Sequence, residues 1–304
     1  MQKQVAVSKT NRRLPWKISK QALFSLLWKI VRLVILLGLC YIILYPFFVK
    51  IMNSFKLVDD FLDPTVRFIP TEFTLENIET VMAQMDYWPT LLNTSLSSVA
   101  LGLIQMIVSA LIGYGLARFK FKGNNLLFFV VILTLIVPPQ TILVPLFMKF
   151  RFFMGFLNLV ETSWPMVILS ATGLGLKNGL YIFLFRQIFK NMPKELEEAA
   201  YLDGCGAFKT FVRIMLPSAT SMMVTVFLLS FSWLWTDTTY SSLFLTDFPV
   251  LSNVVNTIGV SGIPIMAANY KSIAALLSIL PIALLYIFAQ RLFVQSIDRA
   301  GLVG

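Results

Sequence analysis

Histidine is absent from this chain of 304 residues, and cysteine occurs only twice, as Cys40 and Cys205. Without histidine, no imidazole is available as a general base, a metal ligand or a proton relay. Cys40 falls in a long apolar segment and Cys205 in a polar loop, so neither a disulfide nor a metal-binding framework is expected. The sequence therefore predicts no metal site.

Charged side chains are also scarce. They make up 13% of the residues, whereas hydrophobic side chains make up 57%, and a soluble domain carries roughly 25% charged residues. Six apolar segments approach the roughly 20 residues that cross a bilayer. We therefore predict an all-α, polytopic membrane protein with six transmembrane helices, placed near residues 29–52, 91–117, 126–148, 163–186, 217–237 and 272–294. The first segment is too long and begins too deep in the chain for a cleavable signal peptide.

The sequence has no recognisable catalytic constellation. It contains no Gly-x-x-x-x-Gly-Lys-Ser/Thr phosphate loop, no paired carboxylates in a cleft-like context and no nucleophile beside a base. We therefore predict no catalytic residue, no bound cofactor and no enzymatic activity in this chain. If ATP drives its function, another chain must bind the ATP.

The net charge of +10 is distributed unevenly along the chain. Basic residues concentrate in the N-terminal tail, in the 118–125 and 186–216 loops and near the C-terminus, and fewer lie in the other polar segments. By the positive-inside rule, both termini should be cytoplasmic, and the expected partner of the basic tail is anionic lipid rather than nucleic acid. The predicted organisation is a cytoplasmic tail, a transmembrane domain and a C-terminal cytoplasmic tail, at 1–28, 29–294 and 295–304, with external loops at 53–90 and 238–271.

Polar residues inside the apolar segments are candidate functional groups. Lys177 precedes Arg186 by nine residues, or roughly 13 Å along a helix, which is too far for easy snorkelling to the cytoplasmic edge. Pairing with a carboxylate and sensing of an anion are both open for Lys177. Asp237, at the external end of the fifth segment beside Trp235, is a functional group, a helix-end cap or a partner for a neighbouring helix. Uncharged polar residues either bond across helices or line a solute path; these are Gln105, Thr134, Gln140, Thr225, Ser230 and Ser232. Prolines within the segments are either tolerated kinks or points where helices bend to open a path.

The loop at residues 187–216, the EAA loop, has the signals of two short helices. Pro193 suits the first helical position, and acidic residues follow it in the first turns, where the helix dipole favours negative charge. Gly204 suits a left-handed stop. A second helix follows, and Leu216-Pro217 should end it; its apolar residues at helical spacing are Phe208, Phe211, Val212 and Met215. We expect a helix pair at the cytoplasmic edge of the membrane, shaped to bind another protein.

This loop resembles the EAA signature of ATP-binding-cassette (ABC) importer permeases, written E-A-A-x3-G-x9-I-x-L-P. The chain meets every fixed position, with Glu198, Ala199, Ala200, Gly204, Ile214, Leu216 and Pro217. Further strings are similar to the carbohydrate-uptake branch, in particular to the smaller maltose-transporter permease. They include Phe73-Thr74-Leu75-Glu76-Asn77, Ala117-Arg118-Phe119-Lys120-Phe121-Lys122-Gly123 and Gln290-Arg291-Leu292-Phe293-Val294.

The resemblance implies the type I ABC importer permease fold and a multi-pass subunit of the bacterial cell (inner) membrane. Its implied partners are a second homologous permease, two ATP-binding subunits that carry ATP and Mg²⁺, an extracellular solute-binding protein and a sugar substrate. The residues that would couple to the ATPase are Glu198, Ala199, Ala200, Asp203, Gly204, Ile214, Leu216 and Pro217. Candidates for the translocation path are Lys177, Gln105, Gln140, Ser232, Trp235 and Asp237.

The predicted function is import of an oligosaccharide or sugar derivative, driven by ATP hydrolysis on a separate subunit. Permeases for peptides, amino acids or phosphate share the EAA loop and remain the alternative. A membrane enzyme would need intramembrane catalytic pairs and an ion channel a selectivity filter, and neither is visible in the sequence. Lys177 adds the hypothesis of an acidic sugar. Two departures from the family pattern are Thr236, where asparagine is usual, and a C-terminus that lacks the usual lysine.

Overall fold

The computed structural model describes residues 20–259 and 264–301. Within these residues the secondary structure is helical, and no strand is present beyond one isolated bridge between Phe153 and Leu157. The chain divides into two units, residues 1–51 and residues 52–304. The prediction of an all-helical chain is confirmed for the described residues.

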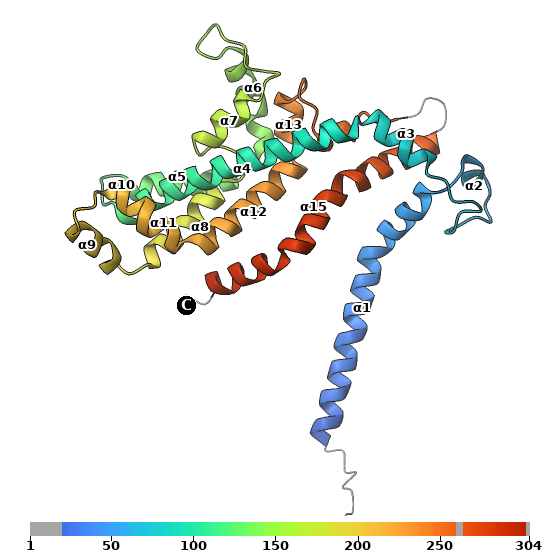
Figure 1. The fold of residues 1–304 in the computed structure, drawn as a ribbon, viewed down its shortest axis with the longest axis horizontal. Helices are drawn as coiled ribbons and strands as arrows, with labels where there is room; N and C mark the ends of the chain where they lie inside the picture. Colours follow the sequence, from blue (N-terminus) through green and yellow to red (C-terminus); the bar gives the residue numbers. More distant parts are fainter. Residues whose placement is uncertain (1–19, 260–263, 302–304) are drawn as a thin grey trace, which may run out of the picture. The chain divides into compact units, whose positions relative to one another are not determined.

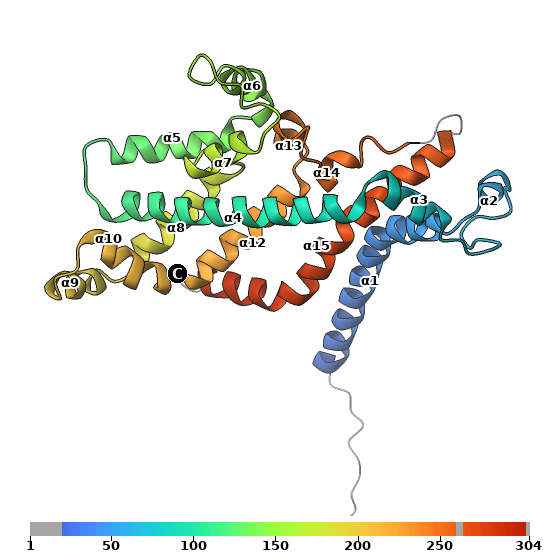
Figure 2. The same ribbon diagram turned by 45° about the horizontal axis from the view of Figure 1, so that its top comes forward.

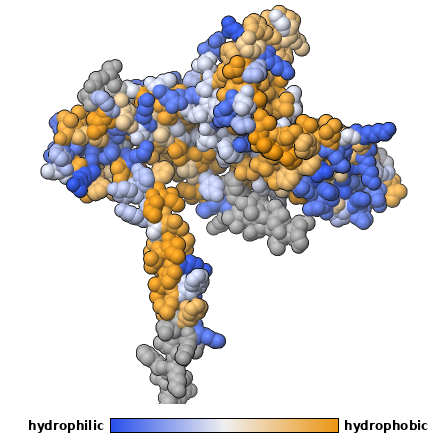
Figure 3. Space-filling view, turned by 180° about the vertical axis from the view of Figure 1, so that it is seen from behind, coloured by the Kyte–Doolittle hydropathy of each residue, from blue (hydrophilic) through white to orange (hydrophobic). Residues whose placement is uncertain are grey.

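The first unit consists mainly of helix α1, Lys20–Ser54. Its hydrophobic side chains are exposed along its length, and Figure 3 shows this helix covered by hydrophobic residues. A stretch of 31 residues, Phe24–Ser54, is long and apolar enough to cross a membrane. The helix begins at Lys20, nine residues before the predicted span. The predicted tail at residues 1–28 thus ends in a helix, and its residues 1–19 lie outside the described part.

The second unit is built around the long helix α4, Tyr87–Arg118. Helices α8, Asn178–Asn191, and α12, Thr220–Thr236, make the most extensive contacts with α4 (Figure 2). Helix α15, Pro264–Gly301, packs in turn against α12 (Figure 1). The predicted spans 91–117 and 272–294 are therefore single helices, although the C-terminal helix also includes much of the predicted tail at 295–304.

Glycine permits the close approach of α4 and α8. A β-carbon added to Gly113 would lie 2.7 Å from Cβ of Phe185 and 2.9 Å from the backbone nitrogen of Arg186. Because contacts this short force atoms to shift, only glycine fits here, as is usual where membrane helices pack through small residues. Buried aromatic side chains fill the space around this contact, among them Tyr181 and Phe189.

The third predicted span is sharply bent. The segment 126–148 consists of α5, Asn124–Ile136, the 3₁₀ helix η1, Pro139–Ile142, and α6, Leu143–Arg151, with a bend of 102° between α5 and the rest. The bend lies at Pro138-Pro139, because each proline removes a backbone donor and restricts the residue before it.

The fourth predicted span, 163–186, is wrong as a continuous helix. The structure divides it into α7, Trp164–Ala171, and α8, which are separated by the linker at residues 172–177. Gly173 and Gly175 lie in this linker, and glycine is a poor helix former. In the described residues, three helices are long and apolar enough to cross a membrane, or up to five if each bent pair counts as one span. The count of six spans therefore stays a prediction.

The predicted external loops contain short helices. Residues 53–90 hold α2, Val58–Leu62, and α3, Glu76–Gln84. Residues 238–271 hold α13, Thr239–Phe244, α14, Leu251–Val254, and the start of α15. A hydrophobic cluster links α3, α4, α12, α14 and α15, so these segments are packed against the helices of the second unit.

Candidate coupling loop and intramembrane polar residues

The EAA loop folds as two helical pieces around a glycine turn. Helix α9, Glu195–Leu202, is followed by Gly204, whose φ of +73° is the left-handed conformation predicted for it. The second piece comprises α10, Ala207–Thr210, the π-helical turn η2, Phe211–Met215, and α11, Leu216–Ser218. It then bends by 80° into α12.

Two boundaries of this loop differ from the prediction. Helix α9 begins at Glu195, two residues after Pro193. The second piece continues through Leu216-Pro217 and breaks at Ala219 instead. Pro217 follows the π-helical turn η2 directly, and the helical conformation continues through it to Ser218, so the proline does not end the helix.

The outward face of the loop carries most of the residues predicted to couple to an ATPase. Glu198, Ala199, Asp203, Gly204 and Pro217 are exposed, whereas the remaining three face inward or are half-buried; these are Ala200, Ile214 and Leu216.

Large apolar side chains surround this outward face. Leu202 is 90% exposed and Phe208 is 69% exposed, although Phe208 was expected to share a face with Phe211 and Met215, which are buried. Exposed apolar residues of this size beside a charged group are typical of an interaction surface. The geometry of the helix pair therefore suits a partner that covers it.

The inward face of the loop is fixed to α4 by a buried polar contact. Oε2 of Glu197 lies 3.2 Å from Nε of Arg118, and Oε1 of Glu197 accepts a 2.8 Å hydrogen bond from the Tyr114 hydroxyl. The Arg118 guanidinium also donates to the backbone oxygens of Met192 and Pro193, at 2.8 and 3.3 Å. Both charged side chains are nearly buried, with 7% of Arg118 and 11% of Glu197 exposed.

The sequence did not indicate this contact. Glu197 belongs to the acidic residues after Pro193 that were attributed to the helix dipole, and no signal in a single sequence pairs it with Arg118, 79 positions earlier. The nearest signal is that the string containing Arg118 and the EAA signature, which begins directly after Glu197, resemble the same family. The helical period then decides which glutamate faces inward, since Glu197 and Ala200, three positions apart, are both buried.

A second cluster of polar side chains lies buried between the helices, close to the break between α7 and α8. Gln105 of α4 donates to the Ser170 hydroxyl at 3.2 Å and accepts from the Ser230 hydroxyl at 3.0 Å. Asn178 donates to the Ser109 hydroxyl at 3.0 Å. All five side chains are buried. For Gln105 and Ser230, the structure shows bonding across helices.

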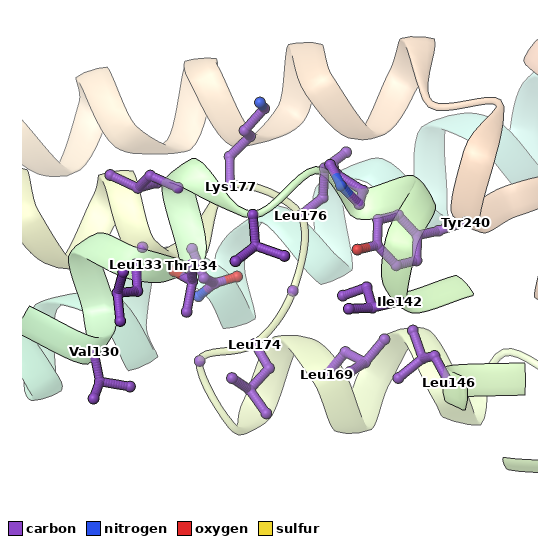
Figure 4. Close-up of a pocket in the computed structure, with 17 residues that line it drawn as sticks. Val130, Leu133, Thr134, Ile142, Leu146, Leu169, Leu174, Leu176, Lys177 and Tyr240 are labelled. Atoms are coloured by element: carbon purple, nitrogen blue, oxygen red, sulfur yellow. The ribbon is translucent and has the colours of Figure 1, made fainter. Parts of the chain in front are cut away.

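Lys177 is the last residue before α8. Its φ is +62°, and its amino group lies 4.8 Å from the centre of the Trp233 ring on α12. It lines a pocket of about 340 Å³ whose other walls are mostly apolar and include Leu133, Leu169 and Leu174. Figure 4 shows the Lys177 side chain extending away from these leucines.

The other residues predicted for the translocation path have different surroundings. Gln140 is exposed in η1. The Trp235 indole is buried and donates to the Ser278 backbone oxygen at 3.0 Å, while the Ser232 hydroxyl donates to the Leu228 backbone oxygen at 2.7 Å. Trp235 thus connects α12 to α15.

Asp237 caps the start of α13. Its carboxylate accepts hydrogen bonds from the backbone nitrogens of Thr239, Tyr240 and Ser241, at 3.1, 3.3 and 2.8 Å. The residue is only 8% exposed. These hydrogen bonds are those of a helix-end cap. In the described part of the chain, no group of three or more His, Cys, Asp or Glu residues is arranged to hold a metal ion.

Comparisons with known proteins agree with these features. The family model described as "Binding-protein-dependent transport system inner membrane component" matches residues 90–299. A probable starch degradation products transport system permease protein of Thermoanaerobacterium thermosulfurigenes is 29% identical over 265 residues, covering 83% of this chain and 89% of that protein. An arabinooligosaccharides transport system permease protein of Halalkalibacterium halodurans is 30% identical over 275 residues, covering 88% and 93%.

A solved structure supports the same fold. The crystal structure of a bacterial ABC transporter involved in the import of the acidic polysaccharide alginate contains a chain similar to this one, with a TM-score of 0.71 and 19% identity. The match covers 90% of this chain and 98% of that chain.

Proposed function

Because this chain belongs to the family of binding-protein-dependent transport system inner membrane components, we propose that it is a permease subunit of an ABC importer for an oligosaccharide or sugar derivative. The family is one of transport subunits rather than enzymes, which agrees with the absence of a phosphate loop from the sequence. ATP and Mg²⁺ then bind to partner subunits, and this chain transmits the effect of ATP hydrolysis to its helices.

The observation that carries this proposal is the exposed EAA loop backed by a buried ion pair. Its outward face presents Glu198, Leu202 and Phe208. Its inward face contacts α4 through Glu197 and Arg118. A helix pair held in this way moves together with α4, so closure of an ATPase around the loop would tilt the helices packed on α4. Such rigid-body motion is a common way to switch between two states.

The sugar class rests on the relatives. Curated relatives that match most of this chain are permeases for starch degradation products, arabinooligosaccharides and melibiose, raffinose and stachyose. The strings in the external segment and near the C-terminus support the same branch. The proposed assembly contains a second, homologous permease, two ATP-binding subunits and an extracellular solute-binding protein.

The proposed topology has six spans and two cytoplasmic termini in the bacterial inner membrane. In this arrangement α1, α4 and α15 cross the membrane as single helices, and the bent segments around α5, α7–α8 and α12 supply the other three crossings. The distribution of basic residues supports this orientation. In the proposed orientation the EAA loop lies on the cytoplasmic side, where ATP is available.

Purification of the tagged chain from its source cells tests this proposal. Mild detergent should retain a second permease and two copies of an ATP-binding subunit, which mass spectrometry of the intact complex identifies by mass. Supplying a mixture of neutral and acidic oligosaccharides, peptides and phosphate then identifies the ligand class retained by the complete complex. A complex without an ATPase, or one that retains peptide in place of saccharide, contradicts the proposal.

A further inference from the structure

The linker between α7 and α8 contains a residue in an unusual conformation. Lys177 has a φ of +62°, in the left-handed region that favours glycine. The same linker uses glycine at Gly173, whose φ is +75°. A long cationic side chain at a position where glycine would be less strained is therefore informative, because such strain is concentrated at functional sites.

The charge of Lys177 has no carboxylate partner within the described residues, where the ion pair found is that of Arg118 with Glu197. The nearest aromatic group is the Trp233 ring, 4.8 Å from the Lys177 amino group. A cation–π contact stabilises an ammonium group in part but leaves its charge unneutralised. Because Lys177 interrupts an apolar segment of spanning length, its charge requires water or an anion.

A row of hydroxyl groups runs along α12, the helix that carries Trp233. Ser221, Thr225, Ser232 and Thr236, which we call the hydroxyl stripe, fall within about a fifth of the helix circumference at 3.6 residues per turn. Each is partly or fully exposed, and Trp233 borders the stripe at 45% exposure. Three of the hydroxyls donate to backbone oxygens of α12; these are Thr225, Ser232 and Thr236.

The oxygens of these three hydroxyl groups can still accept hydrogen bonds. The hydroxyl groups of a sugar are the matching donors. The exposed indole of Trp233 offers a flat apolar surface for the C–H face of a sugar ring, and the Lys177 amine supplies a positive charge. Lys177 also lines the pocket of about 340 Å³, whose other walls are mostly apolar.

We propose that Lys177, Trp233 and the hydroxyl stripe form a solute-contact site that selects saccharides bearing a carboxylate. The Lys177 amine pairs with the carboxylate, Trp233 packs against the sugar ring, and the hydroxyl stripe accepts hydrogen bonds from the sugar hydroxyls. The proposal rests on the proposed function as a saccharide permease. It adds that this subunit itself contacts the solute and that the solute is acidic.

Equilibrium dialysis on the assembled complex in lipid nanodiscs, without the solute-binding protein, tests this site. The probes are radiolabelled trigalacturonate and its carboxyl-reduced, neutral trisaccharide, in which a CH2OH group replaces each carboxylate. Binding is measured without nucleotide and with a non-hydrolysable ATP analogue, so that both orientations of the permease are sampled. The wild-type complex should bind the acidic probe about tenfold more tightly in one of these states, since one charge-assisted hydrogen bond contributes about that factor.

Lys177→Gln should remove this preference, with a loss of about tenfold for the acidic probe and less than about twofold for the neutral one. Lys177→Arg, which keeps the charge, should retain most of it. The matched control is Lys190→Gln, because Lys190 is an exposed lysine on the same helix, α8; it should leave the binding of both probes unchanged.

Equal affinity of the wild type for the two probes, or an equal loss of both in Lys177→Gln, would overturn the inference. Release of the second permease from the Lys177→Gln complex would also overturn it, because Lys177 would then pair with that subunit. The proposed function is judged separately. A complex that imports a neutral saccharide with ATP and binds no acidic probe would keep the function and refute the site.

Discussion

Replacing Glu197 by alanine is expected to release the EAA loop from α4 while leaving the loop's outward face unchanged. In the wild type, the Glu197 carboxylate contacts the Arg118 guanidinium at 3.2 Å and the Tyr114 hydroxyl at 2.8 Å. The alanine variant leaves Arg118 with its two backbone acceptors, on Met192 and Pro193, but without a countercharge.

The size of the effect follows from the burial of the pair. Only 7% of the Arg118 side chain is exposed, so water can do little to replace the lost carboxylate. Removing one member of a buried ion pair costs about 3–5 kcal/mol. If this cost falls on local opening of the loop, amide protection in α9 should fall by a factor of about 100 or more, since each 1.4 kcal/mol is tenfold.

Hydrogen exchange followed by mass spectrometry on peptides that cover residues 195–204 measures this opening in the assembled complex. Glu195→Ala is the matched control, because Glu195 is an exposed glutamate of the same first turn; it should change protection by less than about 1 kcal/mol equivalent. A double-mutant cycle with Arg118→Met should show strong coupling between the two sites. Protection in Glu197→Ala that equals the Glu195→Ala value would refute the anchoring role of the buried pair.

Three further changes test other parts of the structure. Glu198→Arg reverses an exposed charge on the EAA loop and should abolish ATP-driven uptake while the subunits still co-purify; normal uptake would count against the coupling role. Gly113→Ala places a β-carbon 2.7 Å from Phe185 and should lower stability in thermal unfolding by about 1–3 kcal/mol, whereas Gly115→Ala, with open space around it, should not. Asp237→Ala removes three hydrogen bonds at the start of α13 and should cost about 1–2 kcal/mol, seen as faster hydrogen exchange at residues 239–245; unchanged exchange would argue against the cap.

The sequence predicted those features that depend on local chemistry. Helical class and the single helices α1, α4 and α15 follow from apolar runs of spanning length. Gly204 adopts its predicted left-handed conformation, because glycine takes a positive φ without steric cost and commonly ends a helix.

Features that depend on packing were missed. The run 163–186 is apolar enough to span a membrane, but the interior bonds of Gln105 and Asn178 satisfy polar groups around a break that hydropathy alone does not reveal. The inward direction of Glu197 depends on which side of α9 packs against Arg118 of α4, and this contact joins segments that are far apart in the sequence.

ATP-driven uptake by the purified complex in proteoliposomes tests the central claim most directly. Vesicles with ATP inside and the solute-binding protein outside are supplied with a mixture of oligosaccharides, peptides and phosphate, and the imported solute is identified by mass spectrometry. We predict that a saccharide accumulates, that accumulation requires ATP, and that the Glu198→Arg complex imports none. Accumulation of a peptide or of phosphate, or saccharide entry that is independent of ATP, would contradict the account.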